Sequence, residues 1–365
     1  MKPRLLVRLP SWLGDLVAAE PVVRALHAEL AAAGEEDRLS LAAPRHLLAV
    51  LSGVCPGARR IPHEGRGGER AADWRGHDAA LLLTGSFRSA WTAWRAGIPR
   101  RVGWARDGRG PWLTDSMRPA RERGGVPLGL GVAGRRPRYL PRPFGAACIE
   151  LAGLLGVAVH DARPRLGVGA EVRSAVRARR AALGLAPDEP FVLVNAGARP
   201  GSAKGYPPAR WGAVIRSLAS QSGLPALVVG GPGEEAALRA AAQAALPARA
   251  FALDAPVCDL PGLAAHASEA ALVLSADTGP RHVAQAVGAR VVVVAGPTDP
   301  RHSAEHLEQV LLVREEVPCG PCHEERCPLA GEAELACLLR IDPERIAAAG
   351  LALLARPASS AAAPR

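Results

Sequence analysis

The stretch SADTGPRH at 275–282 follows an apolar run and precedes a helical pattern. A strand that empties into Asp277, Thr278 and Gly279 puts polar side chains and free backbone N–H groups at the carboxyl end of a sheet, where open α/β folds bind ligands. Thr278 and the amides around Gly279 suit a diphosphate at a helix start. Asp277 would oppose that charge unless it points toward sugar hydroxyls. His282 is either a donor to phosphate or a half-buried imidazole.

A second polar loop follows the next predicted strand. The run ARVVVVAG at 289–296 ends in GPTDP at 296–300, which contains Thr298. Adjacent strand ends therefore both open into glycine-bearing polar loops, and we expect Thr298 to belong to the same ligand site.

Lys204 lies in the glycine-rich stretch NAGARPGSAKGYP at 195–207, after another predicted strand. The chain has 43 arginines and only two lysines, so a lysine at this position is informative. A compact ammonium on a flexible stem suits phosphate oxygens better than the wide guanidinium fork. The alternative is an exposed lysine in a loop.

Asp15 ends the stretch SWLGD at 11–15, directly after the first predicted strand. Gly14 permits a tight turn, and a carboxylate at a helix start is favoured by the helix dipole. Asp15 is therefore either a helix cap or a carboxylate base at the mouth of the first sheet.

Glu234 lies in a glycine pattern that resembles a dinucleotide-binding turn, GPGEEA at 231–236. Two glutamates stand where a pyrophosphate would need an electropositive helix end, which argues against hydride chemistry. A carboxylate at this position can instead accept hydrogen bonds from ribose hydroxyls.

Four of the seven cysteines lie within 19 residues: Cys319, Cys322, Cys327 and Cys337. Four thiols can hold a structural zinc ion tetrahedrally, although the second pair lacks the close spacing of a zinc ribbon. Free or reversibly oxidised thiols are the alternative. Nothing in this cluster indicates catalysis.

The length and composition fit a two-domain protein of the cytoplasm. The chain has 365 residues, no apolar run near the ~20 residues that cross a bilayer, and an odd number of cysteines. An exported disulfide framework is therefore not expected.

The charge is concentrated in the first half. Residues 1–165 contain 26 Lys and Arg against 15 Asp and Glu, a net charge of +11, and six of the seven tryptophans. This half suits an anionic partner, such as nucleic acid, a membrane surface or an acidic carbohydrate. Solvated arginines over a core that contains tryptophan are the alternative.

Strand and helix patterns alternate along the chain, which predicts an α/β fold with parallel sheets. We expect strands at 4–9, 39–43, 78–83 and 101–104, and a second series at 191–197, 225–231, 249–254, 270–276 and 289–296. The predicted organisation is an N-terminal domain at 1–165, a linker region at 166–187, a C-terminal domain at 188–345, and a helix end with a disordered tail at 346–365. The arginine-rich stretch 105–142 is expected to lack regular structure.

The chain resembles the bacterial heptosyltransferases, glycosyltransferase family 9, in four stretches. These follow one another in this order: PSWLGDLVAAEPVVRAL, GA-x5-AK-x2-P, S-x-DTG-x2-H and GPTDP. The resemblance spans roughly residues 4–346. It implies a GT-B type architecture of two Rossmann-like domains facing across a cleft. In this family the second domain holds an ADP-sugar, and the first holds a growing lipopolysaccharide inner core.

The resemblance also implies roles for the residues singled out above. Asp15 matches the general base and Lys204 the diphosphate-binding lysine, while Glu234 matches a ribose contact less securely. The donor-binding signature is matched by Asp277, Thr278, Gly279 and His282. Tyr206 departs from the family pattern, because it stands where a tryptophan is usual. Pro280, in place of an apolar residue, removes one N–H from the helix start and is expected to weaken phosphate binding slightly.

We therefore expect an inverting glycosyltransferase that needs no metal for catalysis, with an anionic lipid-linked acceptor, peripheral contact with the inner membrane and no nucleic-acid partner. A nucleotide-sugar epimerase of the same fold is one alternative. A basic nucleic-acid-binding protein with a zinc element is another, but it would leave Lys204 and the Asp-Thr-Gly stretch unexplained.

Overall fold

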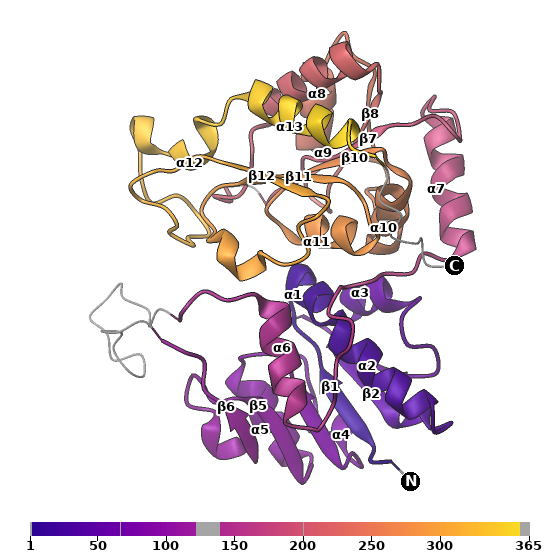
Figure 1. Cartoon of the computed structure of the whole chain (residues 1–365), viewed down its shortest axis with the longest axis vertical. Coiled ribbons are helices and arrows are strands. Elements are labelled where there is room, and N and C mark those ends of the chain that lie inside the picture. Colours follow the sequence, from indigo (N-terminus) through magenta and orange to yellow (C-terminus); the bar gives the residue numbers. More distant parts are fainter. Residues whose placement is uncertain (1, 66, 122–138, 200, 358–365) are drawn as a thin grey trace. The chain divides into compact units, whose positions relative to one another are not determined.

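The computed structural model describes residues 2–65, 67–121, 139–199 and 201–357. The chain divides into two compact units (Figure 1). The N-terminal unit comprises residues 1–164 with 301–305, and the C-terminal unit comprises residues 165–300 with 306–365. Each unit is built around its own parallel six-stranded sheet, so the predicted α/β fold is confirmed.

The N-terminal sheet is formed by short, mostly buried apolar runs, as is usual for parallel strands covered on both faces. Across the sheet, the strands lie in the order β3 (Arg59–His63), β2 (Leu39–Pro44), β1 (Leu5–Arg8), β4 (Ala79–Leu82), β5 (Arg100–Trp104) and β6 (Asp115–Met117). Strand β1 is central and pairs with β2 and β4, with Leu5 opposite both Leu39 and Ala79. The carboxyl ends of β1 and β4 therefore lie side by side.

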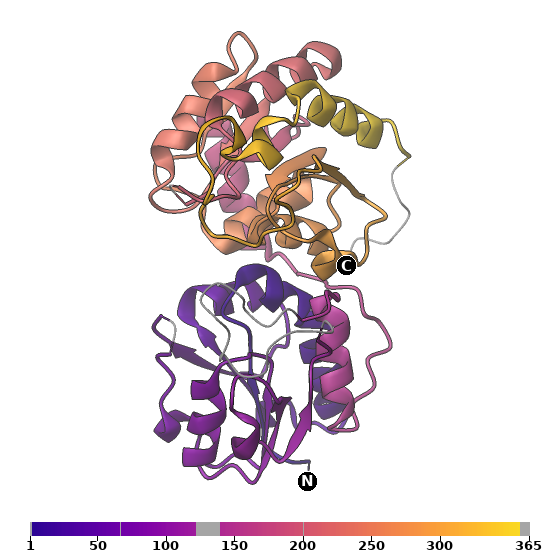
Figure 2. The same ribbon diagram turned by 90° about the vertical axis from the view of Figure 1, so that its left-hand side faces the viewer.

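Helices cover both faces of this sheet (Figure 2). One face carries α4 (Ala71–Trp74) and α5 (Phe87–Arg95), whose inner residues join Leu6 and Leu82 in a buried apolar cluster. The other face carries α1 (Leu13–Ala18), α2 (Glu20–Ala31) and α6 (Phe144–Gly153), which contact one another. A short helix, α3 (Arg45–Leu48), follows β2.

The C-terminal sheet repeats this design. Across the sheet, the strands lie in the order β12 (Val310–Arg314), β11 (Val291–Ala295), β10 (Leu272–Ala276), β7 (Val192–Asn195), β8 (Ala226–Val229) and β9 (Ala250–Ala252). Strand β10 pairs with both β7 and β11, so the loops after these three strands are neighbours at one edge of the sheet.

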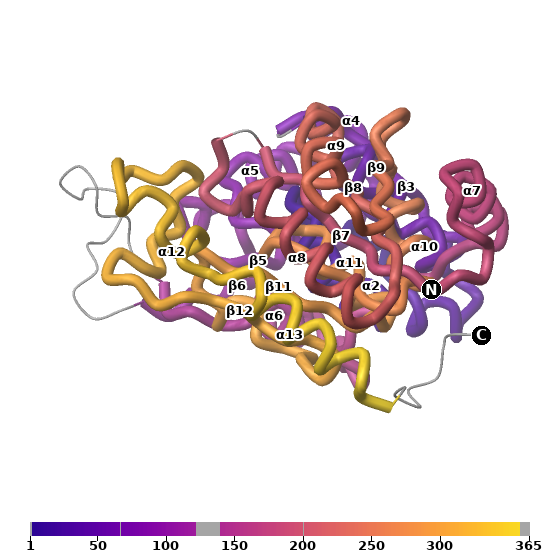
Figure 3. The backbone as a smooth tube through the Cα atoms, turned by 90° about the horizontal axis from the view of Figure 1, so that it is seen from above, coloured from indigo at the N-terminus to yellow at the C-terminus, as the bar shows by residue number. Residues whose placement is uncertain are grey.

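The C-terminal unit has helices on both sides of its sheet. On one side α8 (Pro208–Ser222) packs against α9 (Glu235–Ala244) and α13 (Pro343–Leu354), and the views in Figures 1 and 3 agree on this arrangement. Elsewhere in the unit, α10 (Leu260–Glu269) contacts both α7 (Ala170–Ala182) and α11 (Gly279–Ala286). A short helix, α12 (Ala336–Leu339), precedes α13.

The structure corrects several boundaries. The region 166–187, expected to be a linker, belongs to the C-terminal unit because α7 packs against α10. Strands β3, β6 and β12 were not predicted. Within the stretch 105–142, a 3₁₀ turn, η3 (Gly110–Trp112), and β6 are regular, and 122–138 lie outside the described residues. The helix end expected after residue 345 is that of α13, which ends at Leu354, and 358–365 also lie outside the described residues.

No helix in the described part of the chain combines the length and apolar character that crossing a membrane requires.

Candidate functional site

Most of the residues predicted to bind the donor come together at one edge of the C-terminal sheet. Lys204 lies in the loop after β7, Asp277 and Thr278 follow β10, and Thr298 follows β11. Because β7, β10 and β11 are adjacent, their carboxyl ends place these loops side by side. The predicted sharing of one site by the DTG and GPTDP stretches is consistent with this topology.

Asp277 is held by two internal partners. The Nε atom of Arg281, four residues on in α11, lies 2.8 Å from its Oδ1 atom, and the two side chains are 3% and 12% exposed. The Thr298 hydroxyl donates to Oδ2, which joins the loops after β10 and β11. Burial alone would raise the pKa of Asp277, but Arg281, the Thr298 hydroxyl and Lys204 together lower it. Asp277 is therefore an anion whose charge is largely balanced by Arg281.

His282 is neutral at physiological pH. Removal from water, followed by the positive charges of Arg281 and Lys204, lowers the pKa of the imidazole to about 3, although Asp277 opposes this shift. The ring therefore brings no positive charge to a bound phosphate, but its N–H can still donate a hydrogen bond. Because Asp277 is already paired with Arg281, Lys204 remains as the basic group suited to a ligand anion.

The start of α11 is oriented by Asn195, the last residue of β7. Its Nδ2 atom lies 3.2 Å from the Ser275 hydroxyl and 3.4 Å from the Thr278 hydroxyl. Thr278 is the residue before the helix, and Gly279 and Pro280 are the first two within it. This network fixes the end of β10 and the first turn of α11. In that turn Pro280 has no N–H and the Arg281 amide donates to the Thr278 carbonyl, so the Gly279 amide is the one suited to a ligand at the helix start.

The structure gives Glu234 a structural role, while its contact with a ribose stays a prediction. Its Oε2 atom accepts a hydrogen bond of 2.7 Å from the Gly231 amide and so closes the turn between β8 and α9. Gly197 and Gly230 make room for this carboxylate, because a Cβ atom on Gly197 would lie 1.9 Å from Oε2. A ribose contact would therefore use the other carboxylate oxygen.

The cysteine-bearing segment lies against the donor loops. The Ala203 amide donates to the Glu325 carbonyl, and the His323 amide donates to the Pro297 carbonyl, both at 2.9 Å. One link reaches the Lys204 loop and the other reaches the loop after β11. The segment is therefore hydrogen-bonded to both loops.

Four thiols line a single cavity of about 60 Å³ in this segment: Cys319, Cys322, Cys327 and Cys337. Burial, followed by the other three cysteines, raises the pKa of the Cys337 thiol, so the four sulfur atoms are close enough to interact. Nevertheless, the described residues contain no group of three or more His, Cys, Asp or Glu side chains arranged as metal ligands.

Asp15 lies in the first turn of α1 at the carboxyl end of β1, partly exposed. No side-chain hydrogen bond caps this helix, and the residue at its cap position is Trp12, so Asp15 is not the cap. The charge of Asp15 affects the pKa of the buried Cys148 thiol in α6. Burial, followed by Asp15 and Glu305, raises the pKa of that thiol well above its usual value. Asp15 therefore lies near α6, and its carboxylate is at the carboxyl edge of the N-terminal sheet.

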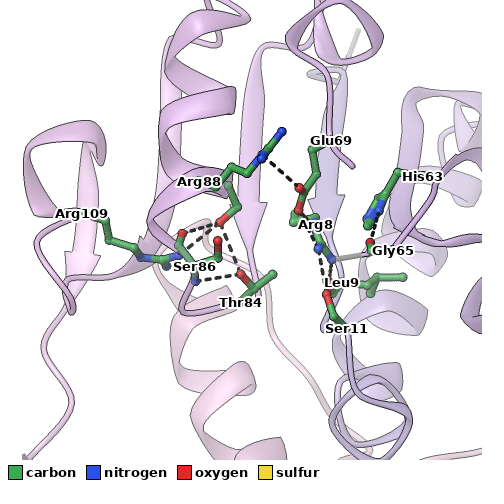
Figure 4. A network of polar contacts seen from close by, with 11 residues as sticks. Arg8, Leu9, Ser11, His63, Gly65, Glu69, Thr84, Ser86, Arg88 and Arg109 are labelled. Carbon is green, nitrogen blue, oxygen red and sulfur yellow. Dashed lines mark hydrogen bonds and ion pairs between the residues drawn. The ribbon is translucent and has the colours of Figure 1, made fainter. Parts of the chain in front are cut away.

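The loop that leads to Asp15 is fixed by Arg8, the last residue of β1 (Figure 4). The Arg8 guanidinium donates to the Leu9 carbonyl and, at 2.9 Å, to the Ser11 hydroxyl. Its counterion is Glu69, with Nη2 and Oε1 2.7 Å apart and both side chains at most 2% exposed. A buried ion pair thus holds the segment between β1 and α1.

His63 completes this network (Figure 4). Its Nδ1 atom donates to the Gly65 carbonyl at 3.1 Å. Burial and the neighbouring Arg8 lower the pKa of the imidazole, although Glu69 opposes the shift. His63 is therefore a neutral partner of the pair and not a second cation.

A second buried arginine fixes the neighbouring loop, between β4 and α5 (Figure 4). Arg109 is fully buried and donates to the Ser86 carbonyl at 3.0 Å and to the Trp104 carbonyl at 2.7 Å. Burial, followed by Arg106, lowers its pKa to about 10. Among the described residues no carboxylate forms an ion pair with it, so its bonds are to backbone and hydroxyl oxygens.

Sequence reasoning missed the residues that hold these sites in place: Arg8, Glu69, Asn195 and Arg281. Two of them carry a signal that could have revealed them. Arg8 interrupts the apolar run RLLVRL, and Arg281 stands four residues after Asp277, the spacing of an ion pair on a helix. Glu69 shows no such signal, because its partner lies 61 residues away.

The chain matches the family model described as glycosyltransferase family 9 (heptosyltransferase) over residues 73–332. No curated protein matches it.

Solved structures of this family are similar over nearly the whole chain. ADP-heptose lps heptosyltransferase II of E. coli is 21% identical with a TM-score of 0.68, and the match covers 96% of this chain and 98% of that one. Family 9 glycosyl transferase from Veillonella parvula DSM 2008 is 17% identical with a TM-score of 0.73, covering 97% and 98%. E. coli heptosyltransferase WaaC, solved with ADP, is 17% identical with a TM-score of 0.61, covering 94% and 95%. The fold is therefore the one these GT-B enzymes adopt.

Proposed function

From the premise that this chain belongs to glycosyltransferase family 9, the heptosyltransferase family, we propose that it transfers a heptose, with inversion, from ADP-heptose to a lipopolysaccharide inner core or a similar anionic glycolipid. The observation that carries the proposal is the charge balance at the edge of the C-terminal sheet. Arg281 and Thr298 hold Asp277, which leaves Lys204 and the Gly279 amide at the start of α11 for the diphosphate.

Asp15 is the proposed general base. Its carboxylate would take the proton from an acceptor hydroxyl while that oxygen forms a bond to the anomeric carbon of the donor sugar. The bond from that carbon to the diphosphate oxygen breaks, and ADP leaves with the bonding electrons. The buried Arg8–Glu69 pair fixes the loop before Asp15, so the base is held by backbone already in place.

The departing diphosphate gains negative charge, and the C-terminal unit supplies the groups to stabilise it. Lys204 would pair with the phosphate oxygens, while Thr278 and the amides near Gly279 donate hydrogen bonds. Neutral His282 would donate through its N–H, and the free oxygen of Glu234 would accept from the ribose. We propose that these groups suffice without a metal ion in catalysis.

The acceptor is proposed to bind at the N-terminal unit, where the chain carries its excess of arginine. That excess matches phosphate and acid groups of a lipid-linked saccharide and a peripheral position at the cytoplasmic face of the inner membrane. We propose that the protein does not bind nucleic acid. A nucleic-acid-binding function would leave Lys204 and the Asp-Thr-Gly stretch at the C-terminal sheet without a role.

The four cysteines are proposed to hold a structural zinc ion. Thiolates are suitable donors for zinc, and all four line one cavity, although the described side chains are not arranged as metal ligands. Since the segment is bonded to both donor loops, metal loss should weaken ADP binding without touching Asp15. Metal analysis and ADP titration before and after chelation test this. Metal-free protein that binds ADP normally would contradict it.

Product analysis tests the proposed reaction. Purified protein is incubated with ADP-heptose and a heptose-free inner-core acceptor, with UDP-, GDP- and CMP-sugars as controls. Mass spectrometry should show the acceptor heavier by one heptosyl unit with ADP-heptose alone. An altered nucleotide sugar formed without acceptor would identify an epimerase instead.

A further inference from the structure

Helix α5 of the N-terminal unit has its large aromatic residues on the outside. The residues that it buries against the sheet are small: Ser89, Ala90, Thr92 and Ala93. Phe87 and Trp94 are 46% and 44% exposed. The hydrophobic effect normally orients a helix on a sheet the other way, with its largest apolar side chains inside. An outward aromatic face on a helix that already has an inner face indicates an external partner.

These two exposed rings form one cluster with two half-buried ones, and we call the cluster of Phe87, Trp91, Trp94 and Trp112 the aromatic surface. The centroid of the Trp112 ring lies 4.7 Å from that of Trp91, 4.9 Å from that of Trp94 and 6.3 Å from that of Phe87. Trp112 also packs against the buried apolar cluster beneath α5. The rings are thus continuous with the core on one side and open to solvent on the other.

The chain around the aromatic surface is strongly basic. Residues 84–121 contain eight arginines, of which Arg109 is buried, and two aspartates, a net charge of +6, and α5 itself contains no acidic residue. On α5, Arg88 and Arg95 are both exposed beside the rings, and the Arg88 Nε atom also lies 4.0 Å from Oε2 of Glu69. Tryptophan with arginine is the combination that lies at the interface of an anionic bilayer, where the ring enters the headgroup layer and the cation meets lipid phosphate.

The aromatic surface is built on a fixed support. Arg109, without a carboxylate partner among the described residues, donates to the Ser86 carbonyl just before α5 and to the Trp104 carbonyl at the end of β5. The chain then turns through η3, which presents Trp112. Both elements that carry the rings are therefore fixed by one buried cation, and little ordering is required on binding.

The aromatic surface begins at the same edge of the sheet as the loop of Asp15. Helix α5 follows β4, α1 follows β1, and these two strands are paired neighbours. A lipid-linked substrate held by a membrane at α5 would thus present its saccharide at the edge that carries the proposed base.

We propose that the aromatic surface and its arginines dock the N-terminal unit on a bilayer rich in anionic lipid. The proposal gives a location to the membrane contact of the proposed function and rests on that function only for its biological use. Docking itself requires no transfer chemistry, and it can be measured without donor or acceptor.

Vesicle sedimentation tests the proposal with the full chain. Wild type is compared with the double variant Phe87→Ser/Trp94→Ser and with Arg95→Gln, using phosphatidylglycerol–phosphatidylcholine vesicles and pure phosphatidylcholine vesicles. The matched controls are Leu246→Ser and Arg216→Gln, which change exposed residues of the C-terminal unit. Circular dichroism and thermal melting confirm that each variant is folded.

Wild type should bind the anionic vesicles, with affinity falling as salt rises. The double variant should bind at least about tenfold more weakly, from the area of two rings, and Arg95→Gln about fivefold more weakly. Both controls should bind as wild type does. Unchanged binding by the double variant, or equal binding of wild type to pure phosphatidylcholine, would overturn the proposal.

A transfer assay separates this inference from the proposed function. With a water-soluble, lipid-free acceptor the double variant should transfer at the wild-type rate, since the rings contact lipid and not sugar. Loss of transfer onto that acceptor would overturn the docking role and assign the rings to the saccharide. Failure of wild type to transfer at all would contradict the proposed function, while the vesicle result would stand.

Discussion

The two sheets share one architecture but place opposite charges at their carboxyl edges. In the N-terminal unit the strand supplies the cation, because Arg8 ends β1 and is paired with Glu69 from a loop. In the C-terminal unit the residue after the strand is the anion, because Asp277 follows β10 and is paired with Arg281 from the helix. Each ion pair holds a loop in position. The group proposed to act on the ligand is an anion in the N-terminal unit and a cation in the C-terminal unit.

The groups that lie next to the two ion pairs distinguish the two edges. Beside the Arg8–Glu69 pair, Asp15 presents a carboxylate suited to accepting a proton. Beside the Asp277–Arg281 pair, Lys204 and the start of α11 present positive charge suited to a diphosphate. The same fold can thus serve either half of a transfer reaction. Each internal ion pair is neutral overall, so the charge that a ligand meets is set by a neighbouring residue, Asp15 at one edge and Lys204 at the other.

The largest expected effect comes from breaking the N-terminal pair. Glu69→Gln leaves the Arg8 cation buried without a counterion, and the free energy of unfolding should fall by about 3 kcal/mol. The double variant Arg8→Met/Glu69→Leu should recover most of that loss. Urea unfolding of the three proteins measures both effects. A Glu69→Gln protein as stable as wild type would show that the pair does not hold this edge.

Breaking the C-terminal pair should act on ligand affinity. Arg281→Met leaves the negative charge of Asp277 uncompensated near Lys204, and ADP should bind about tenfold more weakly, or by about 1.4 kcal/mol. Calorimetric titration measures this, with Arg216→Met as a control on an exposed surface. The double variant Asp277→Asn/Arg281→Met should regain affinity. Normal ADP binding by Arg281→Met would rule out the charge-balance role of Arg281.

An effect of pH on the free energy of unfolding is also expected. Burial, followed by nearby arginines, lowers the pKa of His266 to about 3, as it does for His282. The folded protein then binds fewer protons than the unfolded chain between pH 6.5 and 3, so stability is lost as pH falls through this window. The slope should approach about 1.4 kcal/mol per pH unit for each such group.

Thermal unfolding at pH 4 to 7 tests this pH dependence. His266→Gln should flatten the curve, and the exposed His46→Gln should leave it unchanged. If the His266→Gln curve has the slope of wild type, this histidine does not stay neutral in the folded state.

Much of the fold could be read from the sequence, because apolar runs separated by helical patterns specify parallel strands directly. The three strands that escaped prediction lie at sheet edges. The apolar signal is weak in β3, RRIPH, and in β6, DSM, since edge strands are not buried on all sides, whereas β12, VLLVR, carries an apolar run that could have revealed it. The region 166–187 was expected to be a linker, because the packing of α7 against α10 depends on tertiary contacts.

The candidate site was predictable where function requires an unusual residue, as with Lys204 in a chain that otherwise uses arginine. The residues that hold the site in place were harder to predict from the sequence. Asp277 was expected to point toward sugar hydroxyls, whereas it is bound to Arg281 and Thr298. Glu69 could not be found, because a buried ion pair across distant segments leaves no spacing in the sequence.

The most direct test of the division between the two edges is ADP titration of Asp15→Asn and Lys204→Ala, each paired with its single-turnover transfer rate. Asp15→Asn should bind ADP with wild-type affinity while transfer slows by about 10³-fold. Lys204→Ala should bind ADP at least about tenfold more weakly. An Asp15→Asn protein that loses ADP affinity but keeps its rate, or a Lys204→Ala protein with unchanged affinity, would contradict the account.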